Sequence, residues 1–359
     1  MTVFKQTKLS NQTHQRREHS VLRTPILKLT ADDRPLNDQV MARLMTLSVT
    51  DNKNLDADEL TITLDDHDGA LALPKRGVKL QCWMGFEDAG VHDMGTYIVD
   101  SCEWSGSPDT ISITAKSADF KSSLKSGRSQ SYHNKTLGEI AEAVAKRQQL
   151  TLSIKLELVS IDVGHVDQTD ESDIHLLTRL CHQYGAVVNI KHGKLLVFTA
   201  NSNVSSSGHA LNITVITRQT GDRYRYSVED RQSDYTGVSA GYQDKGKATK
   251  KTATAGNVEK RGGGDDPNTK TKRLKGAYKS KQAAAAAATA EMKRINDEQA
   301  KFSISTVYAY PAVTTESPIT LQGFKAEIDA LKWTVDKATH SYSKSSGLTT
   351  QLDLLASLK

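Results

Sequence analysis

The chain has 359 residues, of which 37% are hydrophobic and 25% are charged, so it can bury two or three ordinary cores and a disordered protein is excluded. Lysine and arginine number 47 against 42 acidic residues, and a net charge of +5 on a chain of this length does not by itself indicate a polyanionic partner. Three widely spaced cysteines without a CxxC pair argue against a disulfide framework or a structural zinc site and favour a reducing compartment.

Residues 1–19 are predicted to form an N-terminal arm. The arm lacks the apolar segment of a signal peptide, and the sequence nowhere has a run of about 18 apolar residues that could cross a membrane. We therefore expect a soluble protein that has no signal peptide and does not contact a membrane.

Residues 20–125 are predicted to form an antiparallel β-barrel. Apolar and polar side chains alternate in several short runs between positions 26 and 120, as they do in strands with one buried face. Turn-forming sequences such as FEDAG and SGSPD separate these runs. Short antiparallel strands with regular turns are typical of a barrel or a sandwich.

A cluster of acids in this part of the chain, DDHDG at residues 65–69, could be a calcium loop or a turn. An EF-hand loop needs an oxygen ligand at its first position and a glutamate at its twelfth, counted so that the glycine is the sixth. Counting from Gly69 puts Leu64 first and Lys75 twelfth, which excludes the calcium loop. The remaining prediction is a turn, in which aspartates accept hydrogen bonds from backbone amides and Gly69 adopts a positive φ.

Residues 126–207 are predicted to form an α/β domain that is inserted between β structures. Alternation of apolar residues from 150 to 158 predicts a strand. The sequence AVVNIKHGKLLVFT predicts a hairpin that turns near residues 192 and 193.

Two amphipathic helices are predicted in this domain. Thr136 and Glu139 form a capping box that opens the first helix. Asp170 is predicted to cap the second helix, and Gly185 is well placed to end it.

Residues that could be catalytic in this domain have simpler explanations. Cys181 and His182 are neighbours on a helix and diverge by about 100°, so the histidine cannot act as a base for the thiol. Glu171 and Asp173 lie at a helix start, where the helix dipole favours acids, and do not indicate a glycosidase pair. The histidines match no zinc-binding spacing, and no phosphate-binding loop or nucleophile-elbow motif occurs. We expect no catalytic site, no metal and no cofactor.

Residues 208–359 are predicted to form a second β-barrel that carries a polar, basic segment and a helix. The segment 243–281 has almost no apolar residues and is predicted to be a long exposed loop. The alanine run that follows predicts a helix over residues 279–300. Such a loop could bind a polyanion through counterion release, or it could simply be solvated. The candidate polyanion contacts are Lys270, Lys272, Arg273 and Lys275.

A repeat links two distant parts of the chain. Residues 97–105 read YIVDSCEWS and residues 333–341 read WTVDKATHS, with an aromatic residue, a valine and an aspartate at matching positions. A shorter echo pairs SVTD at 48–51 with SVED at 227–230. We interpret the two echoes as the trace of two related β-barrels on either side of the α/β domain.

Four blocks of the sequence resemble the phage late control D family, the baseplate hub of contractile tails. The blocks begin at DELTITLDD, MGTYIVDS, QTDESDIH and GFKAEIDA, and they occur in the family's order over nearly the whole chain beyond the N-terminal arm. The resemblance implies that these residues hold structural or assembly positions of the family: Asp65, Asp66, Asp68, Gly69, Pro74, Gly77, Gly95, Asp100, Asp119, Glu171, Asp173, Arg179, Gly185, Gly323, Trp333 and His340.

The resemblance also implies a function, that of the central hub of a phage tail or of a tailocin, a phage-tail-like bacteriocin. Such a hub is a homotrimer whose paired barrels match the hexameric tail tube on one side and the trimeric tail spike on the other. Baseplate wedge proteins and the tape-measure protein are further implied partners, and nucleic acid is expected only inside the lumen. The hub would be assembled in the host cytoplasm and located in the tail baseplate.

Two other functions remain open at this point. One is a peptidoglycan hydrolase at the tail tip, against which the missing acid pair and the missing zinc motif argue. The other is a nucleic-acid-binding late regulator, which the family name and the basic segment 243–281 suggest.

Overall fold

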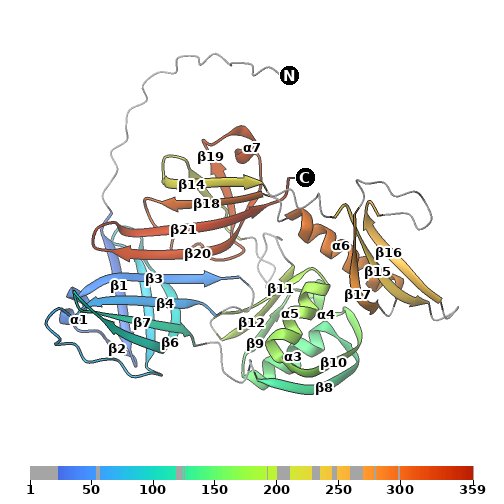
Figure 1. Cartoon of the computed structure of the whole chain (residues 1–359), viewed down its shortest axis with the longest axis horizontal. Helices are drawn as coiled ribbons and strands as arrows, with labels where there is room; N and C mark the ends of the chain where they lie inside the picture. The colour runs from blue at the N-terminus through green and yellow to red at the C-terminus, as the bar shows by residue number, and fades with distance from the viewer. Residues whose placement is uncertain are drawn as a thin grey trace, which may run out of the picture.

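The computed structural model describes residues 23–53, 57–118, 124, 126–191, 193–199, 211–228, 235–244, 249–258, 270–278, 280–297 and 300–358. Figure 1 shows two adjacent β units, a middle unit of helices and strands, and a small unit at the far edge. The fold is mainly β with antiparallel sheets and an inserted α/β region, which confirms the predicted fold class. The predicted N-terminal arm lies outside the described residues. None of the described helices is long and apolar enough to span a membrane.

The first β unit forms because most of its strands carry one apolar face. Its elements are β1 (Pro25–Ala31), β2 (Arg34–Pro35), α1 (Asp38–Ala42), β3 (Leu44–Asn52), β4 (Glu59–Asp65), β5 (Lys79–Phe86), β6 (Gly90–Ser105) and β7 (Thr110–Ser117). The strands pair in the order β3-β4-β7-β6-β5-β1-β2, and every pair is antiparallel. Alternate residues such as Leu60, Ile62 and Val99 are almost fully buried in one core.

The second β unit repeats this arrangement. Its elements are β13 (Thr214–Thr217), β14 (Gly221–Val228), β18 (Ala300–Thr306), β19 (Pro318–Gln322), α7 (Ala326–Asp329), β20 (Trp333–Ser343) and β21 (Gly347–Ala356). The strands pair in the order β14-β18-β21-β20-β19-β13, so the six strands β3 to β1 of the first unit each have a counterpart. One pair differs, because β13 runs parallel to β19 whereas β1 runs antiparallel to β5.

The longer sequence repeat occupies equivalent places in the two units. Tyr97 in β6 and Trp333 in β20 are both buried, with exposed fractions of 2% and 1%. Asp100 is skipped in the register between β6 and β7, and Asp336 is skipped in the register between β20 and β21. Both aspartates therefore mark a β-bulge at the same place in the strand.

The shorter echo is out of register, so that part of the interpretation is wrong. In the first unit, Thr50 of β3 and Ile98 of β6 lie in the same cross-strand row, with β4 and β7 between them. In the second unit, Ser227 of β14 and Thr334 of β20 lie in the same cross-strand row, with β18 and β21 between them. Ile98 and Thr334 are equivalent in the longer repeat, so Ser227 corresponds to Thr50 and not to Ser48. The evidence for a duplication is therefore the shared strand order and the β-bulge at the same place in β6 and β20.

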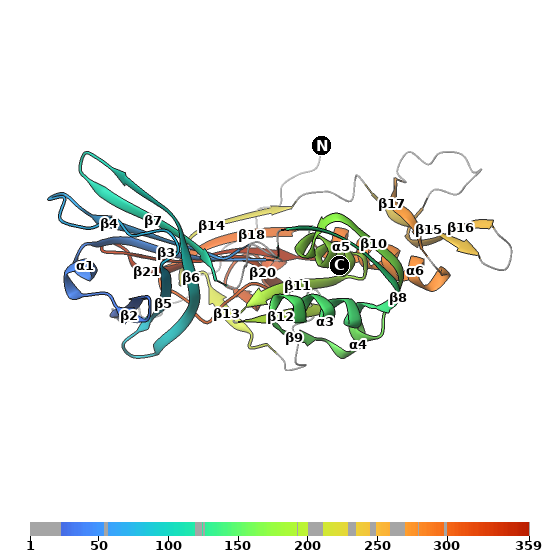
Figure 2. The same cartoon turned by 90° about the horizontal axis from the view of Figure 1, so that it is seen from below.

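The two β units share one sheet. Besides its partners in the second unit, β20 pairs antiparallel with β3, from Lys337 opposite Asn52 to Ser343 opposite Thr46. One sheet of 13 strands therefore runs from one unit into the other. Figures 1 and 2 show the strands of the two units lying next to each other. We call this β3·β20 contact the internal joint.

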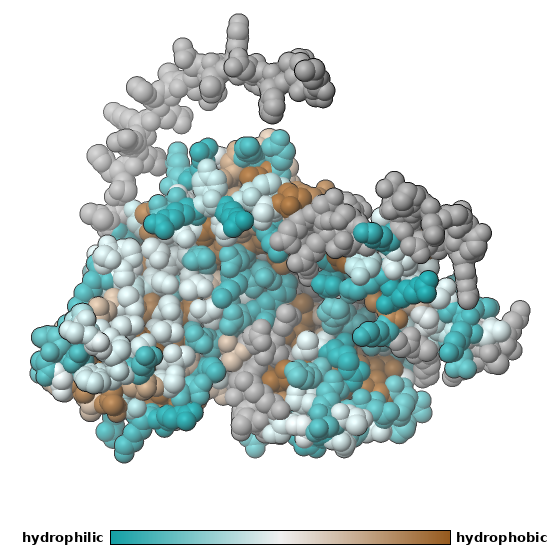
Figure 3. All heavy atoms as spheres, in the orientation of Figure 1, coloured by the Kyte–Doolittle hydropathy of each residue, from teal (hydrophilic) through white to brown (hydrophobic). Residues whose placement is uncertain are grey.

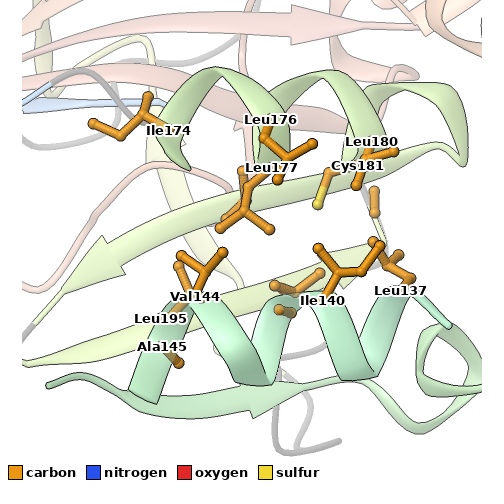
Figure 4. Packing of buried hydrophobic residues seen from close by; sticks show 14 of the residues in the cluster. Leu137, Ile140, Val144, Ala145, Ile174, Leu176, Leu177, Leu180, Cys181 and Leu195 are labelled. Atoms are coloured by element: carbon orange, nitrogen blue, oxygen red, sulfur yellow. The ribbon is translucent and has the colours of Figure 1, made fainter. Parts of the chain in front are cut away.

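The middle unit lies between the two β units in the sequence. Its elements are β8 (Gly127–Thr136), α3 (Leu137–Gln148), β9 (Thr151–Ile154), α4 (Leu156–Val159), β10 (Asp162–Ser172), α5 (Asp173–Gln183), β11 (Ala186–Lys191) and β12 (Lys194–Thr199). The predicted capping box is confirmed, because Thr136 and Glu139 each accept a hydrogen bond from the backbone amide of the other. Figure 4 shows the apolar faces of α3 and α5 turned toward each other, with Ile140 opposite Leu177 and Cys181.

Two local predictions for the middle unit are wrong. The side chain of Ser172, not Asp170, caps α5 by accepting a hydrogen bond from the amide of His175, and Asp170 lies in β10 with a φ of 47°. The strand predicted to continue to residue 158 ends at Ile154, and Leu156 opens the short helix α4 with 86% of its surface exposed. In the first case another side chain two residues later makes the capping hydrogen bond, and in the second a short helix interrupts the alternating strand.

The predicted loop 243–281 is also corrected by the structure. Its described parts contain strands of a small unit made of β15 (Gly237–Asp244), β16 (Thr249–Gly256), β17 (Thr271–Tyr278) and the helix α6 (Lys281–Asp297). The alanines Ala284 and Ala288 of α6 are fully buried against Val238 and Ala240 of β15. The strands need few large apolar residues of their own, because the helix supplies the surface that buries them.

Candidate functional site

The internal joint is the place where the two β units are held together. Leu47 and Val49 of β3 and His340 of β20 face the core and have exposed fractions of 0%, 2% and 1%. Val49 is paired directly with His340 in the strand register. Because β3 and β20 each have a strand partner on both sides here, the joint resembles the interior of one sheet more than a contact between separate domains.

His340 is held as a neutral imidazole in this joint. Its Nε2 lies 3.0 Å from the carbonyl oxygen of Val313, which can only accept, so Nε2 carries the proton and donates. Its Nδ1 therefore accepts from the hydroxyl of Thr350, 2.8 Å away, and that oxygen accepts in turn from the amide of Tyr310. Burial of the ring lowers the pKa of His340 to about 4.

This neutral histidine predicts a pH dependence of stability. Since the pKa of His340 falls from 6.5 in the unfolded chain to about 4 in the fold, its contribution is fully present above pH 6.5 and is lost as the pH falls through 4. The loss is on the order of 3 kcal/mol. We expect denaturant titrations of the unmodified protein to show this loss and those of His340→Gln to show a flatter profile between pH 6.5 and 4. Equal slopes for the two proteins would contradict the assignment.

A buried charge cluster ties the middle unit to both β units. The ammonium group of Lys191, at the end of β11, contacts the carboxylates of Asp51 and Asp58. Asp51 also accepts hydrogen bonds from the amide and the hydroxyl of Thr315, at 2.9 and 3.3 Å. Thr315 precedes β19, so three units of the chain meet at one carboxylate. We call Lys191, Asp51, Asp58 and Thr315 the latch.

One cation between two buried acids leaves the latch short of positive charge. Burial raises the pKa of Asp58 to about 6, and the neighbouring charge of Asp51 adds to this while Lys191 opposes it. Burial alone would lower the pKa of Lys191, but the two carboxylates outweigh it and raise that pKa. The three charged residues of the latch and His340 border the same cavity of about 70 Å³.

The acid cluster at residues 65–69 forms a turn, as predicted. Asp66 is buried and its carboxylate accepts a hydrogen bond from the amide of Leu71 at 2.9 Å. Asp68 pairs with Arg43 at 2.6 Å, and this hydrogen bond lowers the pKa of Asp68. Gly69 has a φ of 62°, the left-handed conformation that a turn without side-chain strain requires. Asp65 closes the turn by accepting from the amide of His67.

The acids of the middle unit hold its own elements together. Asp173 is 2% exposed and accepts hydrogen bonds from Arg147, Gln148 and Gln168 at 2.9 to 3.1 Å. The sequence prediction explained Asp173 only by the helix dipole and did not include these hydrogen bonds. Glu171 forms a bidentate pair with Arg179 at 2.6 and 3.0 Å. Both acids are thus used as structural partners of basic or amide side chains.

Among the remaining residues of the predicted set, Gly77, Gly185 and Gly323 lie in turns or just beyond the end of a helix or strand. Gly77 donates to the carbonyl of Val99, and Gly323 donates to Asp329. A side chain at Gly185 would come within 3.1 Å of Ala290, so this glycine lets α6 pack against the end of α5. The others are Pro74, which is half-buried in the approach to β5, Gly95, which has a φ of 105°, and Asp119, which lies outside the described residues.

The candidate polyanion contacts lie on and just before β17. Lys272 is not available, because its ammonium group pairs with Glu291 at 2.6 Å. Arg273 and Lys275 are exposed, and Lys275 borders an open cleft of about 560 Å³ that Asp167 and Arg179 also line. Since the cleft is lined by acids as well as bases, it is not specific for a polyanion.

Among the described residues, no group of His, Cys, Asp or Glu side chains could hold a metal ion.

The family model described as phage tail baseplate hub (GPD) matches residues 99–346. The chain belongs to this family. It is 36% identical to a probable baseplate hub protein of Escherichia phage 186, covering 92% of each chain, and 35% identical to the one of Escherichia phage P2, covering 92% of this chain and 93% of that one. A 43 kDa tail protein of prophage MuSo2 from Shewanella oneidensis shares the fold, with a TM-score of 0.65, 15% identity, and coverage of 91% and 97%.

In a baseplate hub protein the surface features of interest are those that can join other subunits. Figure 3 shows a face dominated by hydrophilic and neutral residues, where hydrophobic atoms form small separate areas. Two strand edges stand out instead. Within the described residues, β14 is paired only on its β18 side, and the end of β6 from residue 101 to 105 is paired only on its β7 side.

Sequence reasoning missed the latch, and it did not identify which strands of the hub protein form these two edges. Asp51, Lys191 and Thr315 are far apart in the chain and have no common spacing or motif, so no sequence signal joins them. The two edges could be named only after the structure had paired β20 with β3, because the repeat then places β6 at the position of β20.

Proposed function

We propose that this hub protein is a homotrimer that adapts a trimeric tail spike to a hexameric tail tube, in a contractile phage tail or a tailocin. The observation that carries the proposal is the strand order repeated in two β units that are joined edge to edge by β3 and β20. Three chains with two such units each supply six similar units, which is what a threefold assembly needs in order to face a sixfold one.

The internal joint supports this role physically. It connects β3 of the first unit to β20 of the second, and the counterpart of β20 in the first unit is β6 rather than β3, so it is a head-to-tail contact. Head-to-tail contacts that repeat with a constant rotation generate closed rings. The latch holds the middle unit to both β units, so the pair moves as one block when it meets neighbours.

The role is structural and non-enzymatic in this proposal, and no cofactor takes part. The partners would be the tail tube, the spike and baseplate wedge proteins, with the tape-measure protein as a further candidate inside the lumen. The particle would be assembled in the host cytoplasm, and the hub would be located in the tail baseplate.

The proposal is tested by the mass and shape of the purified protein. We expect light scattering at micromolar concentration to give three times the subunit mass of 39.3 kDa. Electron microscopy of the same sample should show a three-lobed ring with an open channel. A stable monomer at that concentration would count decisively against the trimer.

A further inference from the structure

We infer that β14 of one subunit pairs antiparallel with the end of β6 in the next copy of the chain, which rests on the proposed trimer. The inferred register places Arg225 opposite Ser105, Tyr226 opposite Trp104, Ser227 opposite Glu103 and Val228 opposite Cys102. The occupant of each edge is thus a second copy of this chain, and the contact reproduces the internal joint between subunits.

The register follows from the equivalence of the two β units. The longer repeat and its shared bulge make residues 101–105 of β6 equivalent to residues 337–341 of β20. The strand registers that make Ser227 equivalent to Thr50 also make residues 225–228 of β14 equivalent to residues 48–51 of β3. Since His340 lies opposite Val49 in the internal joint, Trp104 is expected opposite Tyr226.

Both edges are available in the single chain. β3 has strand partners on both sides, β4 and β20, whereas its counterpart β14 has a strand partner only in β18 among the described residues. In the same way, residues 337–343 of β20 lie between β21 and β3, whereas the described partners of residues 101–105 come from β7 alone. An unpaired edge of this kind is a template for another strand.

The exposure of the side chains points to the same contact. Trp104 is 55% exposed, although His340 at the equivalent place is 1% exposed. Tyr224 and Val228 are 45% and 47% exposed, and their equivalents Leu47 and Asp51 are 0% and 7% exposed. Large apolar side chains therefore stand uncovered at the positions that the internal joint buries, and pairing with another copy would cover them.

The contact also closes the assembly. Each subunit offers the edge of β14 in its second β unit and the free part of β6, residues 101–105, in its first β unit, so every new contact leaves the same two edges open until the ring is complete. Internal and intersubunit joints would then alternate around the ring. This arrangement gives all six β units similar neighbours.

Cysteine cross-linking tests the register. In a Cys102→Ala background, which places at residue 102 the alanine found at the equivalent Ala338, we would prepare Glu103→Cys with Ser227→Cys and, separately, Trp104→Cys with Tyr226→Cys. Opposing pairs alternate between hydrogen-bonded and non-hydrogen-bonded sites, so one of these two neighbouring pairs has the shorter Cβ separation that a disulfide needs. Mild oxidation with diamide should convert that variant into a covalent trimer on a denaturing, non-reducing gel.

The matched control is Glu103→Cys with Arg225→Cys, which lies on the same face but two residues out of register. It should remain largely uncross-linked, and each single-cysteine variant should remain monomeric on the gel. If light scattering shows a trimer but only the shifted pair cross-links, or neither in-register pair does, the register is wrong while the trimer stands. If light scattering shows a monomer, the proposed function itself fails. Glu103 is exposed and Ser227 is half-buried, so this pair leaves the core intact.

Discussion

Replacing Trp333 by alanine is expected to lower the free energy of unfolding by about 3–5 kcal/mol, the range for deleting a large buried aromatic side chain. Trp333 is 1% exposed and packs against Phe302 and Tyr226, with ring centroids 5.6 and 6.3 Å away. Its Nε1 also donates to the carbonyl of Ile328 at 3.0 Å. The measurement is a urea titration followed by circular dichroism, because the substitution removes a fluorophore.

Two variants show whether the loss comes from this packing. Leu156→Ala removes an apolar side chain that is 86% exposed, and it should change stability by less than about 0.5 kcal/mol. Trp333→Phe keeps most of the buried ring and loses the hydrogen bond, so it should fall between the two. Hydrogen exchange should place the loss of protection in residues 300–358. A Trp333→Ala protein as stable as Leu156→Ala would mean that this core does not hold the second β unit together.

The part of the fold that could be predicted from sequence is the part with local causes. Tyr97 lies within β6 and Trp333 begins β20, the alternation of both strands is visible in the sequence, and the valine and aspartate that follow mark the same bulge in both units. Thr136 and Glu139 satisfy each other's backbone amides within one turn, so their capping box needs no distant partner. Such features depend on residues that are close together in the chain.

The features that failed depend on distant partners or on competing side chains. The strands β16 and β17 look too polar to fold until α6 covers them with alanines, and that helix begins only at Lys281, the last residue of the segment 243–281. Asp170 is as good a cap residue as Ser172, and only the register of β10 decides that the strand continues past it. The role of Asp173 depends on Arg147 in another helix, so the position of Asp173 alone could suggest only a dipole effect.

The latch shows why an assembly protein would keep a buried charge cluster. A well-packed apolar group would hold the units as firmly, and buried ion pairs add little net stability compared with such a group. The carboxylate of Asp51 accepts two hydrogen bonds from Thr315 and contacts Lys191, so it fixes directions as well as distances. Orientation matters here, because the edges of both β units must meet neighbours in register.

Lys191→Met is expected to destabilise the chain by about 3–5 kcal/mol at pH 7.5, because it leaves the carboxylates of Asp51 and Asp58 buried without their cation. The loss should shrink as the pH falls. The pKa of Asp58 is already raised to about 6, and without Lys191 it rises further. An acid whose pKa is raised in the fold favours folding below its unfolded pKa of 3.8, and this contribution disappears as the pH rises through the folded value. The variant should therefore recover part of its deficit between pH 7.5 and 5.

Lys194→Met is the matched control, since it makes the same chemical change on the same hairpin at an exposed position. It should alter stability by less than about 0.5 kcal/mol and show no recovery at low pH. Asp58→Asn in the Lys191→Met background should restore stability at pH 7.5, because it removes one of the two uncompensated charges. If Lys191→Met and Lys194→Met have the same stability at every pH, the latch does not couple the middle unit to the β units. The two β units of each subunit would then need another contact to keep their strand edges aligned.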